Sequence, residues 1–565
     1  MTIHLLNKNV YPDKRELLLS LFADPISQFE DTASIAEFQF PELPSKPFKR
    51  SSSMSTDWSQ KNVKYKTIPS FVDKACALKP ALIHKTIVPV AAAIDSRPVS
   101  LGTFYSHGFS RNTVGVLDFG NHAVGYLTLY VDALDGPYDA PAFIKLKFCE
   151  HRRELGENSA EYDGWIGKGW LQEEWLHIDD FPAVIRLPRR YAMRYLLLEV
   201  LDTSPNYRLC VTKVEFDTVT SASNQNLPDL KITDPLLSKI DAVSLQTMRV
   251  CMQEVFEDGP KRDRRLWLGD LRLQALVNAT TFRNFDLVKR CLYLFAGMVR
   301  DDGAVASCLY AEPRLLPGDI FLLDYSLFFI PTLLDYFSET HDQQTLLELA
   351  PTALRQLELA QTHILPEGII APEGKYCCFI DWNEALDKQT AMNGVWLYSL
   401  QQGMQLCKLL HDDETGQRLE QAYVKGKAAI WARLWDADRR MFVSGPDRQI
   451  SWASQVWMCL AGVISGPEAA QLLRRATDTT EIVSMTTPYM FHHYIQALID
   501  CGEADKAAQE VRRYWGGMIE AGADTFWELY DPKDLHTSPY GSNMINSCCH
   551  AWSCTPAYFL RKQLI

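Results

Sequence analysis

The sequence predicts a two-domain protein in which an antiparallel β-sandwich over residues 1–225 is followed by an (α/α)6 barrel over residues 226–565. Three observations lead to this prediction. Apolar and charged residues alternate in the N-terminal part, the segment 218–234 is rich in polar residues, and helical periodicity dominates after it. The length of 565 residues also suits two large units.

The composition excludes several classes of protein. A hydrophobic content of 47% with 22% charged residues is typical of a globular chain. The net charge of −13 repels phosphate backbones, so we expect no nucleic-acid partner. Residues 1–22 lack the apolar core of a secretory signal, and the apolar stretch 320–337 is interrupted by Asp324 and Asp335, so we expect no membrane span.

The fourteen cysteines are scattered along the chain, and none has CxxC spacing. The adjacent pairs Cys377–Cys378 and Cys548–Cys549 cannot easily close a loop or hold a zinc ion. We therefore expect a cytoplasmic protein with reduced thiols, without a structural metal and without a cofactor.

The sandwich prediction depends on short segments in which alternate residues are apolar. The clearest is 144–148, where Ile144, Leu146 and Phe148 alternate with two lysines, as expected for a strand with one buried face. Further strands are expected at 125–131, 195–200 and 209–216, with turn-forming residues between them. The Ser-rich segment 49–56 is expected to be an exposed loop, and 218–234 to be the domain boundary.

The second domain is predicted to contain about twelve helices, which would form the six hairpins of an (α/α)6 barrel. A solenoid of helix pairs is the competing architecture, but the sequence has no fixed-period repeat. The expected helices are 236–256, 269–280, 284–300, 318–339, 342–363, 390–411, 413–434, 451–464, 466–476, 488–501, 503–517 and 545–561.

Acidic and aromatic residues concentrate in three predicted loops. Residues 257–270 read EDGPKRDRRLWLGD, and their Gly-Pro turn could display the charged side chains in a cleft; the alternative is a solvated cluster in which Asp270 caps a helix. Residues 378–384 contain an Asp-Trp pair, which suits a sugar-binding pocket floor or an ordinary core edge. Residues 523–531 surround Glu528 with aromatic side chains, either in a pocket or in an exposed loop.

Two carboxylates on facing loops of an α barrel are what glycoside hydrolysis requires. One carboxyl group protonates the leaving oxygen, and the other activates water or attacks the anomeric carbon. The sequence has no nucleophile elbow, P-loop, dinucleotide-binding fingerprint or HExxH helix. His492 and His493 are adjacent on a predicted helix and point in different directions, so we expect a structural role for both.

These motifs resemble those of the bacterial α-L-rhamnosidases of glycoside hydrolase family 78, and the similarity covers most of the chain. The DGPKRD segment at 258–263, followed by Trp267 and Gly269-Asp270, is similar to the family's most specific motif. Asp381-Trp382, the segment 525–528 and His550 are similar to further family motifs, although Cys549 stands before His550 where the family has Asn. In the sandwich, 118–127 and 190–196 resemble two family strands.

The resemblance implies an inverting α-L-rhamnosidase. Asp263 falls at the position of the general acid, where the family usually has Glu, and Glu528 falls at that of the general base. We expect Arg262 to bond the sugar or Asp258, and Arg264 to face solvent. The side chains expected to bind the substrate are Asp258, Arg262, Trp267, Asp270, Asp381, Trp382, Trp527 and His550.

The expected substrate is a small rhamnoside, such as a disaccharide or a flavonoid glycoside, because the chain lacks an export signal and ends soon after the last predicted helix. A homodimer is expected from base rates alone. Two alternatives stay open. One is another inverting (α/α)6-barrel glucoside hydrolase or phosphorylase, and the other is a non-catalytic sugar-binding protein on the same fold.

Overall fold

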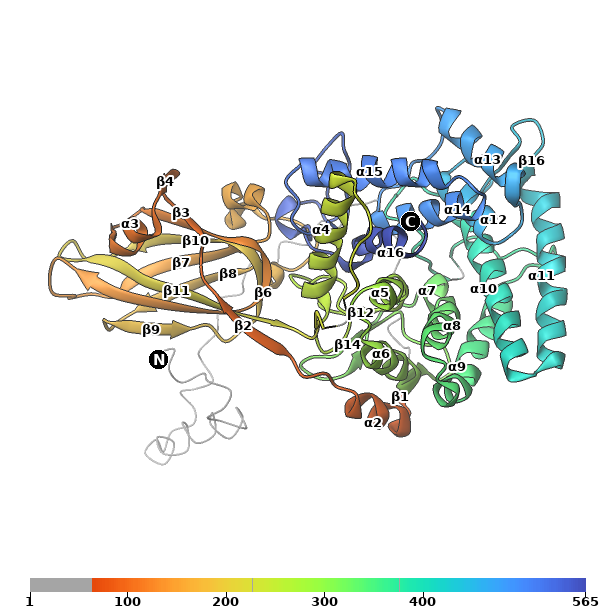
Figure 1. Ribbon diagram of the computed structural model, residues 1–565, viewed down its shortest axis with the longest axis horizontal. Coiled ribbons are helices and arrows are strands. Elements are labelled where there is room, and N and C mark those ends of the chain that lie inside the picture. Colours follow the sequence, from red (N-terminus) through yellow and green to blue (C-terminus); the bar gives the residue numbers. More distant parts are fainter. Residues whose placement is uncertain (1–63, 226, 375, 565) are drawn as a thin grey trace, which may run out of the picture.

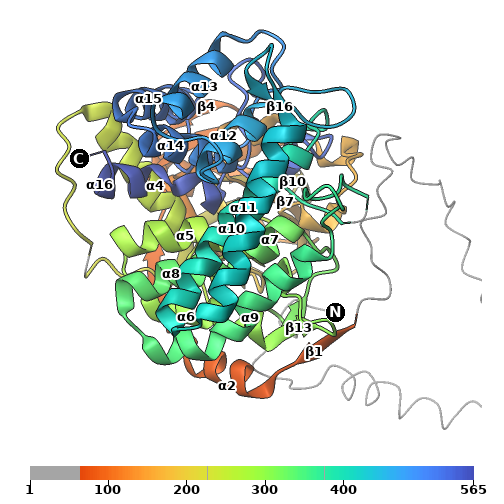
Figure 2. The ribbon, with the colours of Figure 1, turned by 90° about the vertical axis from the view of Figure 1, so that its right-hand side faces the viewer.

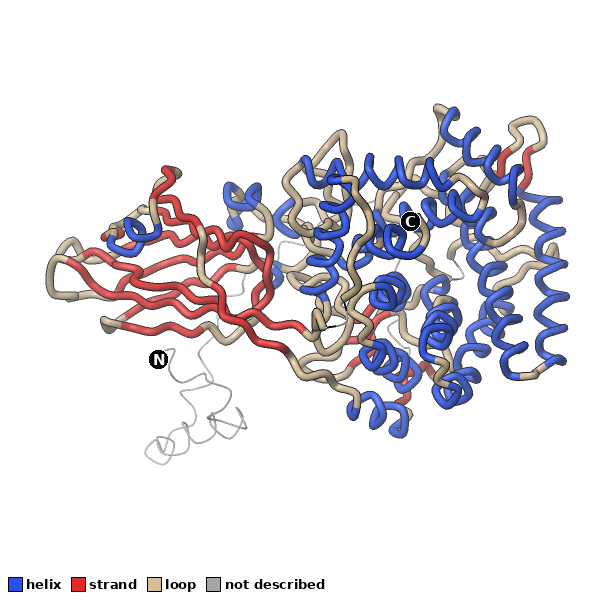
Figure 3. The backbone as a smooth tube through the Cα atoms, viewed as in Figure 1, coloured by secondary structure: helices blue, strands red, loops and turns tan. Residues whose placement is uncertain are grey.

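The computed structural model describes residues 64–225, 227–374 and 376–564. A strand-rich N-terminal domain and a helical C-terminal domain lie side by side along the long axis of the molecule (Figure 1, Figure 3). The expected loop 49–56 and the segment 1–22 lie outside the described residues.

Strand β6 organises the N-terminal domain because it belongs to both layers of the sandwich. Its first part, up to Asp118, lies between β3 and β10, and its second part, from Gly125 on, pairs with β11 and then β9. The pairing with β10 is interrupted between Asp118 and Ala123 and continues to Gly125, and the interruption contains Gly120, whose φ is 83°. The strands are β2 (Ile83–Ile87), β3 (Ala91–Ile94), β4 (Arg97–Val99), β5 (Gly108–Phe109), β6 (Val114–Leu134), β7 (Ala142–Cys149), β8 (Glu173–Ile178), β9 (Ala183–Arg186), β10 (Tyr191–Asp202) and β11 (Arg208–Thr220).

The predicted alternation is confirmed in β7. Ile144, Leu146 and Phe148 are buried in the core of the sandwich, where they join side chains from both layers such as Leu129 and Phe216. The antiparallel β-sandwich predicted from the sequence is therefore present.

The first described residues belong spatially to the helical domain. Strand β1 (Tyr65–Thr67) pairs with β13 (Met298–Arg300), and helix α2 (Pro69–Ala77) packs against helix α6 (Phe285–Gly297), far from the sandwich (Figure 1). Gly297 permits this packing, since a Cβ there would lie 2.8 Å from Val72. The chain thus contributes to the helical domain before it enters the sandwich.

The helical domain contains an inner and an outer layer of helices. α5, α8, α10, α12 and α14 contact one another in this order, and the turn η8 with α16 closes the ring back to α5. Figure 2 shows this domain end-on, with α10 and α11 facing the viewer. The helices are α4 (Pro235–Cys251), α5 (Leu268–Thr280), α6 (Phe285–Gly297), α7 (Leu323–Leu327), α8 (Phe329–Thr340), α9 (Gln343–Gln361), α10 (Gln389–Leu410), α11 (Asp413–Leu434), α12 (Trp452–Leu460), α13 (Gly466–Asp478), α14 (Pro488–Asp500), α15 (Ala504–Glu520), η8 (Ala551–Cys554) and α16 (Pro556–Lys562).

Burial distinguishes the two layers, as the sequence predicted. Most of α10 is buried, whereas α11 buries only four residues, Leu419, Gly426, Ile430 and Leu434. An inner helix is covered on all sides and needs apolar residues all round, while an outer helix needs one apolar stripe. The closed ring confirms the barrel prediction over the solenoid.

The ends of several expected helices shift by up to five residues, as in 236–256, which ends at Cys251, and two expected helices differ in more than their ends. The expected helix 318–339 begins at Leu323 and is divided at Phe328 into α7 and α8. The expected helix 545–561 begins as the turn η8 at Ala551, because the preceding backbone is held in a loop by hydrogen bonds from His550 to Phe526 and from Glu528 to Ser547. This loop forms part of the candidate site. Among the described helices, none combines the length and apolar character that a membrane span needs.

Candidate active site

A cleft with a volume of about 1770 Å³ opens at one end of the barrel, where the inner helices begin. Asp270 lies in the first turn of α5, Asp381 and Trp382 precede α10, and His550 precedes η8. These four residues, together with Glu528, line the cleft. The three segments that the sequence singled out therefore meet in one place.

Asp258 holds the first of these segments in a compact loop. Its two carboxylate oxygens accept hydrogen bonds from the backbone N–H groups of Arg265, at 2.9 Å, and Asp263, at 3.2 Å. Its backbone oxygen accepts a bond from Ala551 at 2.7 Å, which joins the loop to the start of η8. Gly259 makes the tight turn possible, because a Cβ there would lie 2.6 Å from the backbone oxygen of Arg262.

Arg262 links the loop to Glu528 across the cleft. Its Nη2 donates to the Glu528 carboxylate at 2.6 Å, and its Nε donates to the backbone oxygen of Ile545 at 2.7 Å. The other Glu528 oxygen accepts a hydrogen bond from the Tyr540 hydroxyl. Glu528 is therefore held at both oxygens, and the expected bond from Arg262 to Asp258 is replaced by one to Glu528.

Asp263 is the more exposed of the two predicted catalytic carboxylates. Its side chain is 19% exposed, against 6% for Glu528. Nη1 of Arg262 lies 3.5 Å from one Asp263 oxygen, and Nε of Arg265 lies 3.8 Å from the other. Asp263 and Glu528 thus contact different nitrogens of the same guanidinium group, which places both in one cleft.

Arg264 does not face solvent as expected. Its guanidinium is largely buried and donates to the backbone oxygens of Pro260, at 2.8 Å, and Arg190, at 2.7 Å. Burial and then the neighbouring Arg190 lower the pKa of Arg264 to about 10. The side chain fastens the loop to the sandwich, a contact that no local pattern could reveal.

Two buried carboxyl groups at the cleft floor surround a buried histidine. His550 Nε2 lies 3.9 Å from Asp258, and its Nδ1 lies 3.8 Å from Asp270. Burial and then the nearby Asp263 raise the pKa of Asp258 to about 7, and burial and then Asp258 raise the pKa of Asp270 well above its usual value. Burial and then Arg262 lower the pKa of His550 to about 3, so this imidazole is neutral at pH 7. The floor can therefore donate as well as accept hydrogen bonds.

Asp270 is positioned by a glycine and a tyrosine. A Cβ at Gly269 would lie 2.4 Å from the ring of Tyr325, so only glycine lets this ring approach α5. The Tyr325 hydroxyl then donates to one Asp270 oxygen at 3.3 Å. The other Asp270 oxygen and Nδ1 of His550 are buried and have no hydrogen-bond partner among the residues that the structure describes. Both atoms are therefore available to a ligand in the cleft.

Asp381 is occupied by protein donors. Its carboxylate accepts hydrogen bonds from the hydroxyl group of Thr487 at 2.6 Å and from the hydroxyl and backbone N–H groups of Thr486 at 3.0 and 2.9 Å. These bonds hold the start of α14 against the loop that carries Trp382. The neighbouring Trp382 lines the cleft, and its buried Nε1 has no hydrogen-bond partner in the described part of the chain. Trp382 is thus the member of the pair that offers a free group to a ligand.

The two remaining tryptophans predicted as binding residues lie in different places. Trp267 lines the cleft and packs edge-on against Tyr325, with ring centroids 6.0 Å apart. Trp527 is buried behind Glu528, where the guanidinium of Arg153 lies 4.2 Å from its ring centroid. Trp527 does not line the main cleft, because adjacent residues in an extended segment point in opposite directions.

Several residues at the site were not singled out from the sequence, among them Tyr540, Asp163 and Trp165. Tyr540 bonds Glu528, and Asp163 and Trp165 line the cleft from the sandwich domain. Tyr540 falls within a loop that has no readable pattern, and the other two are more than 90 positions away from the nearest barrel motif. No sequence signal could place them there.

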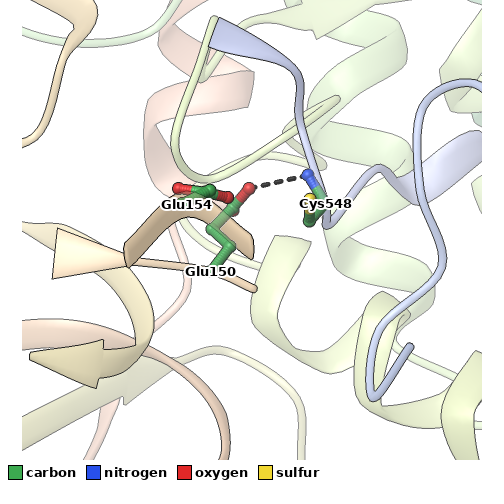
Figure 4. Close-up of side chains that lie close together, drawn as sticks. All are labelled: Glu150, Glu154 and Cys548. Atoms are coloured by element: carbon green, nitrogen blue, oxygen red, sulfur yellow. Dashed lines mark hydrogen bonds between the residues drawn. The ribbon is translucent and has the colours of Figure 1, made fainter. Parts of the chain in front are cut away.

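Lys261 points away from the cleft, toward the sandwich. Its Nζ lies 3.1 Å from Glu154 and 3.8 Å from Glu150. Glu150 in turn accepts a hydrogen bond from the backbone N–H of Cys548 at 2.7 Å (Figure 4). These contacts tie two loops of the site, 258–265 and 545–550, to the sandwich domain.

Three of these neighbours, Glu150, Glu154 and Cys548, are also the one set of potential metal ligands found among the described residues (Figure 4). Three observations argue against a metal ion there. Lys261 already supplies a positive charge, both Glu150 oxygens contact protein groups, and burial raises the pKa of the Cys548 thiol to about 12. A thiol must lose its proton to bind a metal, so this cluster is better suited to an ion pair.

Two family models match the chain. The N-terminal domain model of the glycosyl hydrolase family 78 α-rhamnosidases matches residues 95–218, and the model of the bacterial α-L-rhamnosidase six-hairpin glycosidase domain matches residues 229–564. The chain belongs to the bacterial α-L-rhamnosidases of glycoside hydrolase family 78. This membership confirms the predicted family, the class of glycoside hydrolases and the six-hairpin barrel.

Solved structures agree with this membership in family 78. A rhamnosidase from Klebsiella oxytoca with rhamnose bound is 44% identical, with a TM-score of 0.86 over 88% of this chain and 99% of that chain. A family 78 rhamnosidase from Bacillus sp. GL1 is 23% identical, with a TM-score of 0.69 over 80% of this chain and 46% of the other; at this identity the match concerns the fold alone. No curated protein sequence matches the chain.

Proposed function

We propose that this family 78 member removes terminal α-L-rhamnose from small rhamnosides with inversion at the anomeric carbon. The observation that carries the proposal is the placement of Asp263 and Glu528 in one cleft, on either side of Arg262. An inverting enzyme needs a carboxylic acid near the leaving oxygen and a carboxylate that activates water on the opposite face, with the two groups about 6.5–9.5 Å apart.

Asp263 is the proposed general acid, and Glu528 the proposed general base. The greater exposure of Asp263 supports its role, because the acid must meet the leaving oxygen, while the oxygens of its neighbour Asp258 are taken by backbone N–H groups. The bonds from Arg262 and Tyr540 keep the Glu528 carboxylate oriented toward a water molecule. The acid gives its proton to the departing alcohol, and the base takes one from water as the new C–O bond forms.

The rhamnose ring is proposed to occupy the floor of the cleft. Asp258, Asp270 and His550 offer donors and acceptors to the sugar hydroxyls, and the unpartnered atoms of Asp270 and His550 support this role. Trp267 and Trp382 offer apolar surface to the C–H faces and to the C5 methyl group. The hydrogen bonds of Asp381 and the position of Trp527 support an indirect role for these two residues, in which they hold the loops that carry Trp382 and Glu528.

The experiment that tests the proposal compares p-nitrophenyl α-L-rhamnoside with the corresponding α-glucoside, with and without phosphate. We expect turnover of the rhamnoside that is independent of phosphate. A dependence on phosphate would indicate a phosphorylase, and preference for the glucoside would indicate another substrate class. Rhamnose binding without turnover would indicate a sugar-binding protein.

A cytoplasmic location and a homodimer remain parts of the proposal. All fourteen cysteines lie in the described part of the chain and are free thiols, which supports a reducing compartment. Size-exclusion chromatography with light scattering tests the homodimer; a monomeric mass would contradict it.

A further inference from the structure

A loop of the sandwich domain forms one wall of the cleft. Between β7 and β8 the chain makes three short turns, and Tyr162 from this region packs with Tyr540, Met544 and Ile545 in a separate apolar cluster. The fit is tight, since a Cβ at Gly164 would lie 2.6 Å from the Tyr162 hydroxyl and 2.8 Å from the backbone oxygen of Tyr540. The wall is therefore fixed to the same tyrosine that bonds Glu528.

Trp165 projects from this wall into the outer part of the cleft. Its Nε1 donates to the backbone oxygen of Pro539 at 3.2 Å, and its ring lies 5.6 Å from that of Tyr540. The residue is nevertheless 50% exposed. A large aromatic side chain that is anchored at one edge and open on the other side offers a rigid surface to a flat ligand.

The position of the Trp165 ring in the cleft indicates which part of a substrate it would contact. The buried groups at the floor, Asp258, Asp270 and His550, are each less than 5% exposed, and the terminal sugar must reach them. The leaving group must then lie toward the exposed part of the cleft lining, and Trp165 and the exposed Asp163 belong to that part.

We propose that Trp165 is an aromatic platform for the leaving group, so that the sandwich domain gives the enzyme a preference for aryl rhamnosides. This inference rests on the proposed function and names its substrate class. The ring of the leaving group stacks on the open face of Trp165, and Asp163 accepts hydrogen bonds from phenolic hydroxyl groups. The platform acts on the leaving group and not on the rhamnose ring.

A second tryptophan of the same domain provides a matched control. Trp175 on β8 is 55% exposed, with Nζ of Lys145 lying 5.4 Å from its ring centroid, and it does not line the cleft. Trp165→Ala and Trp175→Ala remove similar amounts of exposed aromatic surface from the same domain. A difference between the two variants therefore reports position and not the loss of a tryptophan in general.

The test measures kcat/KM for p-nitrophenyl and methyl α-L-rhamnosides, and inhibition by free rhamnose, in the wild type and in Trp165→Ala, Trp165→Phe and Trp175→Ala. We expect Trp165→Ala to lower kcat/KM for the aryl substrate about tenfold, which is the size of one aromatic stacking interaction. Methyl rhamnoside and rhamnose inhibition should change less than about twofold, Trp165→Phe should recover part of the loss, and Trp175→Ala should match the wild type.

Two results would overturn the platform. An equal loss of kcat/KM on both substrates, with weaker inhibition by rhamnose, would assign Trp165 to the sugar site or to loop stability. An unchanged kcat/KM for the aryl rhamnoside in Trp165→Ala would show that Trp165 has no role in binding the leaving group. Absence of rhamnoside turnover in the wild type would instead contradict the proposed function itself.

Discussion

Lys261 and Arg262 are neighbours in the chain, but their side chains lie in two different buried clusters of charged residues, one between the domains and one in the cleft. Lys261 joins Glu150 and Glu154 of the sandwich, and although burial lowers its pKa, these two carboxylates raise it above the usual value, so the lysine stays charged. Arg262 enters the cleft cluster, where it pairs with Glu528. One cluster joins the domains, and the other lines the cleft.

The clusters differ in how completely their charges are paired. In the interdomain cluster a cation lies between the two glutamates, whereas Asp258 and Asp270 have, among the described residues, His550 as their ion-pair partner, and this histidine is neutral. Unpaired buried carboxyl groups cost stability and are kept where a ligand will use them. Buried carboxyl groups without a cation beside them, and not burial alone, therefore separate the candidate catalytic site from a structural contact.

The largest effect on activity is expected when the two proposed reacting groups of the cleft, Asp263 and Glu528, are replaced. Asp263→Asn and Glu528→Gln should each lower kcat on p-nitrophenyl α-L-rhamnoside by about 10³-fold, because each removes a proton-transfer group while keeping its shape. Rhamnose binding, measured by calorimetry, serves as the control and should persist. A variant that keeps activity within about tenfold of the wild type would contradict the role of that residue.

The next effect concerns protein stability and is expected when the interdomain cluster of Lys261, Glu150 and Glu154 loses its cation. Lys261→Met leaves Glu150 and Glu154 buried without their cation, and should cost about 3–5 kcal/mol of stability, measured as a lower thermal midpoint. Adding Glu154→Gln should recover part of this loss. The control is Lys74→Met, which breaks the partly exposed pair with Glu348 and should cost less than about 1 kcal/mol. An equal loss of stability in Lys261→Met and Lys74→Met would contradict the stronger contribution expected of the buried Lys261.

A smaller effect concerns the orientation of Glu528. Tyr540→Phe deletes the hydroxyl that bonds this carboxylate and keeps the ring that packs against Trp382. A hydrogen bond to a charged group contributes about 1.5–3 kcal/mol, so kcat should fall about tenfold to a hundredfold. A change in KM for rhamnosides with unchanged kcat would assign Tyr540 to substrate binding instead.

The last effect concerns the pH dependence of stability and follows from the raised pKa of Asp258. Because the pKa rises from 3.8 to about 7 on folding, the folded protein binds this proton more tightly, and the resulting stability is full below about pH 4 and lost as the pH rises through about 7. Asp258→Asn cannot ionise, so its thermal midpoint should fall less between pH 4 and 7 than that of the wild type. Asp413→Asn on α11 is the control. The same change in thermal midpoint between pH 4 and 7 for both variants would contradict the raised pKa of Asp258.

The fold and the loop 258–270 could be predicted from the sequence because the information is local. Alternation identifies β7, helical periodicity identifies α10 and α11, and the DGPKRD segment brings Asp258 and Asp263 together within a few residues. The split at Phe328 and the late start of η8 were not predicted, since both depend on contacts with distant segments.

Side-chain direction in the other two segments could not be predicted for the same reason. Asp381 is used by two threonines that are more than 100 positions away, and Trp527 faces Arg153 of the sandwich while its neighbour Glu528 faces the cleft. Trp165 reaches the cleft only because the sandwich packs against the barrel. A sequence indicates which residues are chemically competent, and tertiary contacts determine which of them face the substrate.

The central claim is that Asp263 and Glu528 act as acid and base on opposite faces of the sugar. The most direct measurement is ¹H NMR of the first sugar released from p-nitrophenyl α-L-rhamnoside, recorded before mutarotation. We expect β-L-rhamnose as the first-formed anomer, because water attacks from the face opposite the leaving group. Initial release of α-L-rhamnose would contradict it, since retention requires a carboxylate that attacks the anomeric carbon directly.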